Sequence, residues 1–122
     1  MKVIIDLIED IREEISNQED FILTAMLLRE DDSNPERLIY AGEAPISEYV
    51  LDDRDRKLIF KINRSASIMH IGDLVKHLLV LPMADMMYEL RVDIETHHNA
   101  VAIVGFGKSL QEKKYLLFIK LV

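Results

Sequence analysis

The sequence predicts an α+β fold, a two-layer sandwich of two helices on a mainly antiparallel sheet of about six strands. Two stretches of helical periodicity are each followed by a run of short alternating segments, and short turns join these segments. The length of 122 residues, 49% of them hydrophobic, corresponds to a single domain, residues 1–122, with one core. No residue-level repeat is evident between the two halves, so their similarity is one of element order.

In the first half, apolar residues recur at helical spacing near the start of the chain and predict a helix over residues 2–17. Residues 21–28 are almost continuously apolar, as expected of a strand that is covered on both faces, and a short buried helix is the alternative. Turn-forming residues then separate three further predicted strands. The turns are residues 30–35, 42–45 and 52–56, and the strands are residues 37–41, 46–51 and 57–63.

In the second half, helical spacing returns over residues 70–81, and Pro82 marks the end of that helix. The clearest strand alternation of the chain follows at residues 88–95. Two more strands are expected at residues 100–106 and 115–121. An apolar strand at the edge of an open sheet needs cover, so residues 115–121 favour pairing with a second copy as a homodimer.

Composition excludes several classes of function. The chain has 15 basic and 22 acidic residues, a net charge of −7, and this balance disfavours nucleic acid as a partner. It has no cysteine, which excludes thiol catalysis and cysteine-based metal sites. Acidic residues interrupt the apolar start, and the apolar run 78–84 is too short to cross a membrane. We therefore expect a cytoplasmic protein without a membrane segment and without a cofactor.

Two features favour a non-catalytic protein-interaction or regulatory module. Methionines cluster just after the second helix, and thioether side chains adapt to irregular partner surfaces, although core filling is their commoner role. The first helix has an acidic face that would suit a basic partner, although a solvated face is the ordinary reading. The candidate contact residues are Met83, Met86, Met87, Asp6, Asp10 and Glu13. The expected partner is another protein or a second copy of the chain.

The alternative function is a small metal- or ligand-dependent enzyme. Asp93, Glu95 and His97 occupy alternate positions, so an extended strand places all three side chains on one face, where they could bind a divalent metal. His98 and His70 are the nearest additional candidates for ligands. The wet face of an amphipathic strand produces the same pattern, and residues of one strand do not complete a site by themselves.

The segment Gly105-Phe106-Gly107-Lys108-Ser109 has the ending of a phosphate-binding loop but not its full pattern. That loop requires GxxxxGK[ST], and the position that should hold the first glycine is Ala102. The residues that follow favour a strand over the helix that such a loop needs. A strand end or bulge that tolerates glycine is the expected structure.

Overall fold

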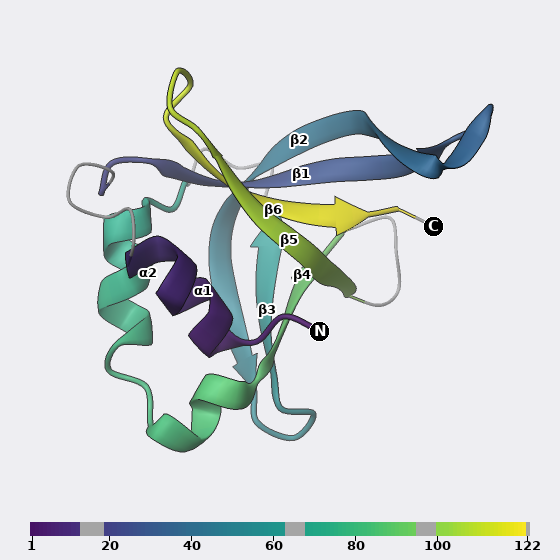
Figure 1. The fold of residues 1–122 in the computed structure, drawn as a ribbon. Helices are drawn as coiled ribbons and strands as arrows, with labels where there is room; N and C mark the ends of the chain where they lie inside the picture. The colour runs from purple at the N-terminus through teal and green to yellow at the C-terminus, as the bar shows by residue number, and fades with distance from the viewer. Residues whose placement is uncertain (13–18, 63–67, 95–99, 122) are drawn as a thin grey trace.

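The computed structural model describes residues 1–12, 19–62, 68–94 and 100–121 (Figure 1). Two α-helices, one 3-10 helix and six strands make up this part of the chain. In sequence order they are α1 (Ile4–Arg12), β1 (Ile22–Asp31), β2 (Asn34–Asp52), β3 (Lys57–Ile62), α2 (Ile71–Leu78), η2 (Met83–Met87), β4 (Glu89–Asp93), β5 (Val101–Ser109) and β6 (Lys114–Lys120).

The six strands form a closed barrel in the order β1 to β6. The hairpins are antiparallel, but β3 pairs with β4 in parallel, and β1 pairs with β6 in parallel to close the ring. The predicted α+β two-layer sandwich is therefore wrong. Alternation along the sequence indicates hairpins, whereas parallel pairing between strands that are distant in sequence leaves no local pattern. Closure also pairs β6 on both sides, so the exposed edge predicted at residues 115–121 does not exist.

Both helices lie on one side of the barrel and contribute to the same hydrophobic core (Figure 1). α1 buries Ile4 and Leu7 completely, and α2 buries Leu74 and Leu78. These side chains join those that the strands direct inward, among them Phe60. Each fully buried aliphatic side chain contributes about 1.5–3 kcal/mol of transfer free energy. This core orients the helices and leaves their other faces toward solvent.

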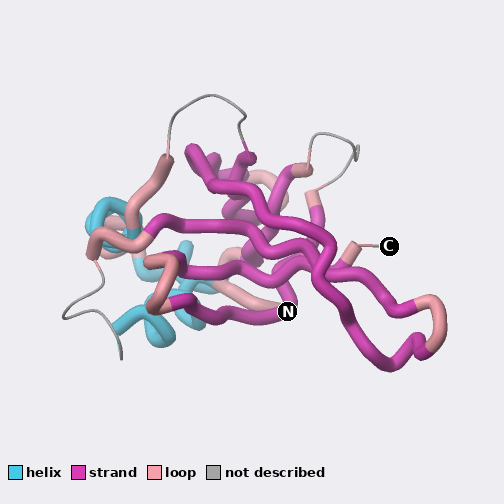
Figure 2. Tube along the Cα trace, turned by 90° about the horizontal axis from the view of Figure 1, so that it is seen from above, coloured by secondary structure: helices cyan, strands magenta, loops and turns pink. Residues whose placement is uncertain are grey.

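Strand β2 is one continuous element, whereas the sequence predicted two strands interrupted at residues 42–45. Gly42 has a φ of 138°, and the pairing register with β1 shifts at this point. A bulge of this kind bends a strand without ending it, because glycine adopts the required backbone conformation at little cost. The hairpin of β1 and β2 consequently continues past Leu28, the last residue of β1 that pairs with β6, as a projecting arm, residues 29–39 (Figure 2).

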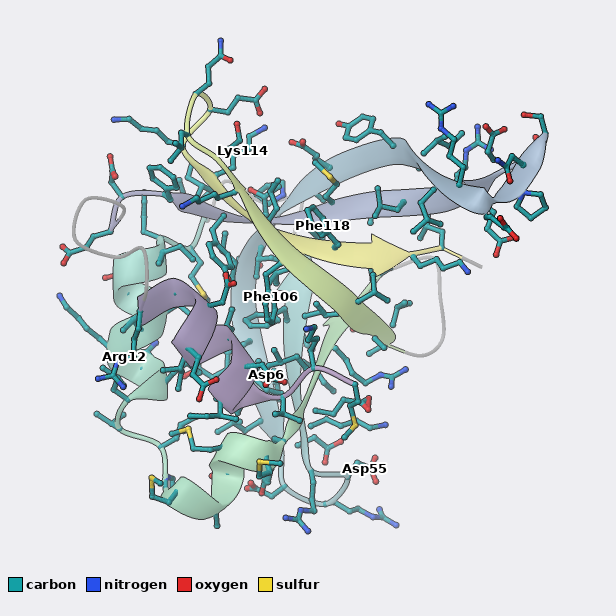
Figure 3. All side chains as sticks on the ribbon, in the orientation of Figure 1. Asp6, Arg12, Asp55, Phe106, Lys114 and Phe118 are labelled. Carbon is teal, nitrogen blue, oxygen red and sulfur yellow. The ribbon has the colours of Figure 1, made fainter. Side chains whose placement is uncertain are left out.

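Strand β5 runs to Ser109, beyond the predicted end at residue 106, because its glycines accommodate an aromatic ring. Phe118 of β6 lies against Gly105 and Gly107 (Figure 3). A Cβ atom added at Gly107 would lie 2.5 Å from Cζ of Phe118. The glycine-rich segment is therefore a bulged strand, as predicted, and does not precede a helix.

The second half of the barrel repeats the first at the level of single hydrogen bonds. Val3, before α1, bridges Glu89 of β4, and His70, before α2, bridges Ile22 of β1. His70 lies 67 positions after Val3, and Glu89 lies 67 positions after Ile22. Two further pairs of backbone hydrogen bonds are related by the same shift of 67 positions. Ile4 N donates to Tyr88 O, as Ile71 N donates to Phe21 O. Leu23 N donates to Met69 O, as Leu90 N donates to Lys2 O.

The β2–β3 and β5–β6 hairpins also correspond, with a shift of 57 positions. Ile46 pairs with Ile62 as Ile103 pairs with Ile119, and an irregularity follows each pair at the equivalent position. The turns match as well, because Arg56 and Lys113 are the two non-glycine residues with positive φ in the described chain, at 56° and 54°. The identical residue pairs are Ile4 and Ile71, Asp6 and Asp73, Leu7 and Leu74, Leu23 and Leu90, Ile46 and Ile103, Lys57 and Lys114, and Ile62 and Ile119.

The expectation of no residue-level repeat was therefore wrong, and the arm explains why. Between the paired residues Ala25 and Ala44 lie ten more residues than between their counterparts Val92 and Val101. The shift changes from 67 to 57 at this insertion, so no single offset aligns the two halves. The chain consists of two α-β-β-β units, and outside the arm the described α-helices and strands of one unit have structural counterparts in the other.

Substitution of Gly107 by alanine should destabilise the barrel, because the new methyl group would displace the ring of Phe118. We expect a loss of about 1–3 kcal/mol in the free energy of unfolding, measured by urea denaturation. Val50, the counterpart of Gly107 in the first unit, is 42% exposed, so Val50→Ala should change stability by less than about 0.5 kcal/mol. Equal stability of Gly107→Ala and wild type would contradict the packing described for Phe118.

Candidate functional site

The residues proposed for a metal site are only partly described. Asp93 ends β4 and faces outward, whereas Glu95, His97 and His98 lie outside the described residues. His70, just before α2, forms a backbone bridge with Ile22 of β1. Asp93 pairs with Lys61 of β3 instead, so the strand pairing does not bring His70 and Asp93 together. Within residues 1–12, 19–62, 68–94 and 100–121, no three histidine or carboxylate side chains are grouped to hold a metal ion.

A groove of about 630 Å³ crosses the outer face of β2, β3 and β4. Lys57 and Lys61 of β3 and Arg91 of β4 supply its cations. Arg91 is held in place, because its Nε donates to the carbonyl oxygen of Ala100 at 2.9 Å and its guanidinium pairs with Glu89. The full lining is Val50, Leu51, Asp52, Asp53, Asp55, Lys57, Ile59, Lys61, Arg91, Asp93 and Ala100.

The charges of this groove alternate in sign. Asp52 is the cross-strand partner of Lys57, and Asp93 is the cross-strand partner of Lys61. A phosphate site requires an excess of positive charge, and this lining has none. The described residues that line it include no serine, threonine, cysteine or histidine. In the described part of the chain, the groove is a mixed-charge surface.

Two of the acidic residues predicted for partner binding have structural contacts. Asp6 accepts a hydrogen bond from the backbone N–H of Val3 at 2.9 Å, which satisfies a free donor before the first turn of α1. The carboxylate of Asp10 accepts a hydrogen bond from the hydroxyl of Tyr115 and so ties α1 to β6. Glu13 lies outside the described residues. At Asp6 and Asp10, the acidic face of α1 therefore contributes to the fold.

Two tyrosines resist ionisation. Burial raises the pKa of the Tyr115 phenol above its ordinary value, and the hydrogen bond to Asp10 raises this pKa further. The hydrogen bond that the Tyr88 hydroxyl donates to Asp53 at 2.8 Å raises the pKa of Tyr88 to about 12. In both cases the folded protein stabilises the neutral phenol relative to the phenolate.

The free energy of unfolding should therefore fall above pH 10. The stabilisation from both phenols is complete below pH 10, where tyrosine is neutral in the unfolded chain as well, and it is lost as the pH rises toward 12. Urea denaturation at pH 9 and pH 11 measures this fall, which should be smaller in Tyr115→Phe than in wild type. The same fall in both proteins would show that Tyr115 does not contribute.

The methionine cluster divides into buried and exposed members. Met86 is only 8% exposed and belongs to the core, whereas Met83 is 83% and Met87 62% exposed. Leu79 and Val80, which follow α2, are 58% and 80% exposed. We call these four exposed residues, Leu79, Val80, Met83 and Met87, the α2–η2 apolar surface. The uncharged run 78–84 was the sequence signal that could have added Leu79 and Val80 to the candidate residues.

The other unit of the same chain has polar residues at the corresponding sequence positions. The residues 67 positions before its four members are Arg12, Glu13, Ser16 and Asp20, all of them polar. Of these, Arg12 and Asp20 are described and exposed, and Arg12 extends away from the strands (Figure 3). At these two described positions the first unit has polar residues where the second exposes Leu79 and Met87, and Glu13 and Ser16 lie outside the described residues.

No protein family, curated protein or solved structure matches this chain. In the part of the chain that the structure covers, no helix has the length and apolar character needed to cross a membrane.

Proposed function

We propose that the chain is a non-catalytic protein-binding module that contacts its partner through the α2–η2 apolar surface. The observation that supports this proposal is the contrast between the two units at equivalent positions. Exposed apolar side chains gathered in one place are uncommon on monomers and are typical of interaction sites. Because the first unit has exposed polar residues, Arg12 and Asp20, at the counterparts of Leu79 and Met87, the requirements of the barrel do not explain these two exposed apolar residues.

The groove over β2 to β4 carries alternating charges, which suit polar contacts with a partner protein. The described residues group no three histidine or carboxylate side chains that could hold a metal ion. Oriented side chains such as Arg91 suit polar contacts at the edge of a protein interface. The lack of cysteine suits the cytoplasm, which we keep as the expected compartment.

A photo-crosslinking amino acid at position 83 tests the proposal in cells that naturally produce the protein. Met83 is 83% exposed, so its replacement should leave the fold intact. We expect one covalent adduct of defined mass on a denaturing gel. A second change on the same surface, Val80→Asp, should remove at least about 90% of that adduct, because a charge cannot be buried there without a large cost.

Leu110 provides the matched control. It is 62% exposed in the β5–β6 turn, where it lies outside the α2–η2 apolar surface. The same crosslinker at Leu110 should give no defined adduct. Equal adducts at Met83 and Leu110, or an adduct at Met83 that Val80→Asp leaves unchanged, would contradict a specific binding surface.

A further inference from the structure

We propose that the α2–η2 apolar surface binds a second copy of this chain, so that the protein is a homodimer with a twofold axis through this surface. The proposal rests on the proposed function, since it names the occupant of the same surface. It replaces the homodimer contact predicted at residues 115–121, because β6 pairs with both β1 and β5 inside the barrel.

The composition of the surface is the first argument. No charged residue occurs from Leu78 to Ala84, and Pro82, Met83 and Ala84 are all exposed. The centres of homodimer interfaces are more apolar than the surfaces used in transient complexes, which resemble the rest of a protein surface. A second copy supplies an equally uncharged face, and an isologous contact buries both faces at once.

Opposite charges on the two helices are the second argument. Lys76 is exposed one helical turn before Val80, and Glu9 is exposed on α1, which packs against both η2 and α2. Neither side chain makes an ion pair within the described residues. Lys76 lies 67 positions after Glu9, so these residues are counterparts of opposite charge. A twofold axis that brings α1 of one copy to α2 of the other pairs Glu9 with Lys76 twice.

The net charge of −7 repels a second copy and limits the strength of this dimer. Salt screens that repulsion over about 8 Å at physiological ionic strength, whereas the contact between apolar side chains is short-ranged and survives. The two pairings of Glu9 with Lys76 act at close range and set the orientation of the copies more than their affinity. The apolar side chains therefore supply most of the attraction, and the flanking charges select the twofold arrangement.

Sedimentation velocity of the purified full chain tests the proposal from about 1 to 500 µM protein in about 150 mM salt. The expected species has about twice the chain mass of 14.2 kDa. Val80→Asp should raise the dissociation constant about tenfold or more, because it places two like charges at the centre of the contact. Leu110→Asp, at the exposed β5–β6 turn, should leave the dissociation constant unchanged. Circular dichroism confirms that both variants are folded.

A charge exchange tests the orientation. Glu9→Lys and Lys76→Glu should each weaken the dimer several-fold by creating like-charge contacts, and the double variant should restore wild-type association. A dimer that responds to Val80→Asp but shows no such restoration would overturn the proposed pairing of α1 with α2.

The crosslinking experiment separates this proposal from the proposed function. An adduct at Met83 with twice the chain mass supports the second copy. A monomer at every concentration, together with a Val80-dependent adduct of another mass, overturns the homodimer and leaves the binding module in place. A monomer with no adduct at Met83 overturns both. A dimer that Val80→Asp does not change overturns the homodimer at this surface.

Discussion

The two parallel strand pairs, β1 with β6 and β3 with β4, are the constraint on which the rest of the structure depends. They close the barrel, and they also join its two units. Each helix is tied to a strand of the opposite unit, because the backbone oxygen of Lys2 accepts from Leu90 and that of Met69 accepts from Leu23. The segment that leads into α1 thus pairs with the start of β4, and the segment that leads into α2 pairs with the start of β1. Each unit therefore completes its hydrogen bonds only in the presence of the other.

The local elements of this fold could be predicted from the sequence, and its closure could not. Helical spacing located both helices, and turn residues located the hairpins at residues 30–35 and 52–56. Closure depends on pairing between β1 and β6, which lie at opposite ends of the chain and carry no mutual pattern. The repeat was missed because its matching residues are mostly buried apolar ones, such as Leu23 and Leu90, and because the arm interrupts the offset.

The candidate site could be predicted only at the level of a segment. The methionine cluster drew attention to residues 83–87, but helical and 3-10 geometry decide which side chains face the core. Met86 is buried while Met83 and Met87 are exposed, a distinction that has no signal in a run of similar residues. Asp6 and Asp10 looked like a solvated face, and their bonds to Val3 and Tyr115 appear only after folding brings the partners together. Comparison between the two units separates the residues that the barrel requires in both units from those that are found in one unit only.

The projecting arm shows where this architecture accepts a change in chain length. All ten additional residues of the first unit lie between Ala25 and Ala44, and the pairing on either side of them matches the second unit. The connection between β4 and β5 is the equivalent place in the second unit. For protein engineering, the end of the arm is a site where a peptide epitope could be grafted while the barrel keeps its register, so this small scaffold offers a display position that its own architecture already tolerates.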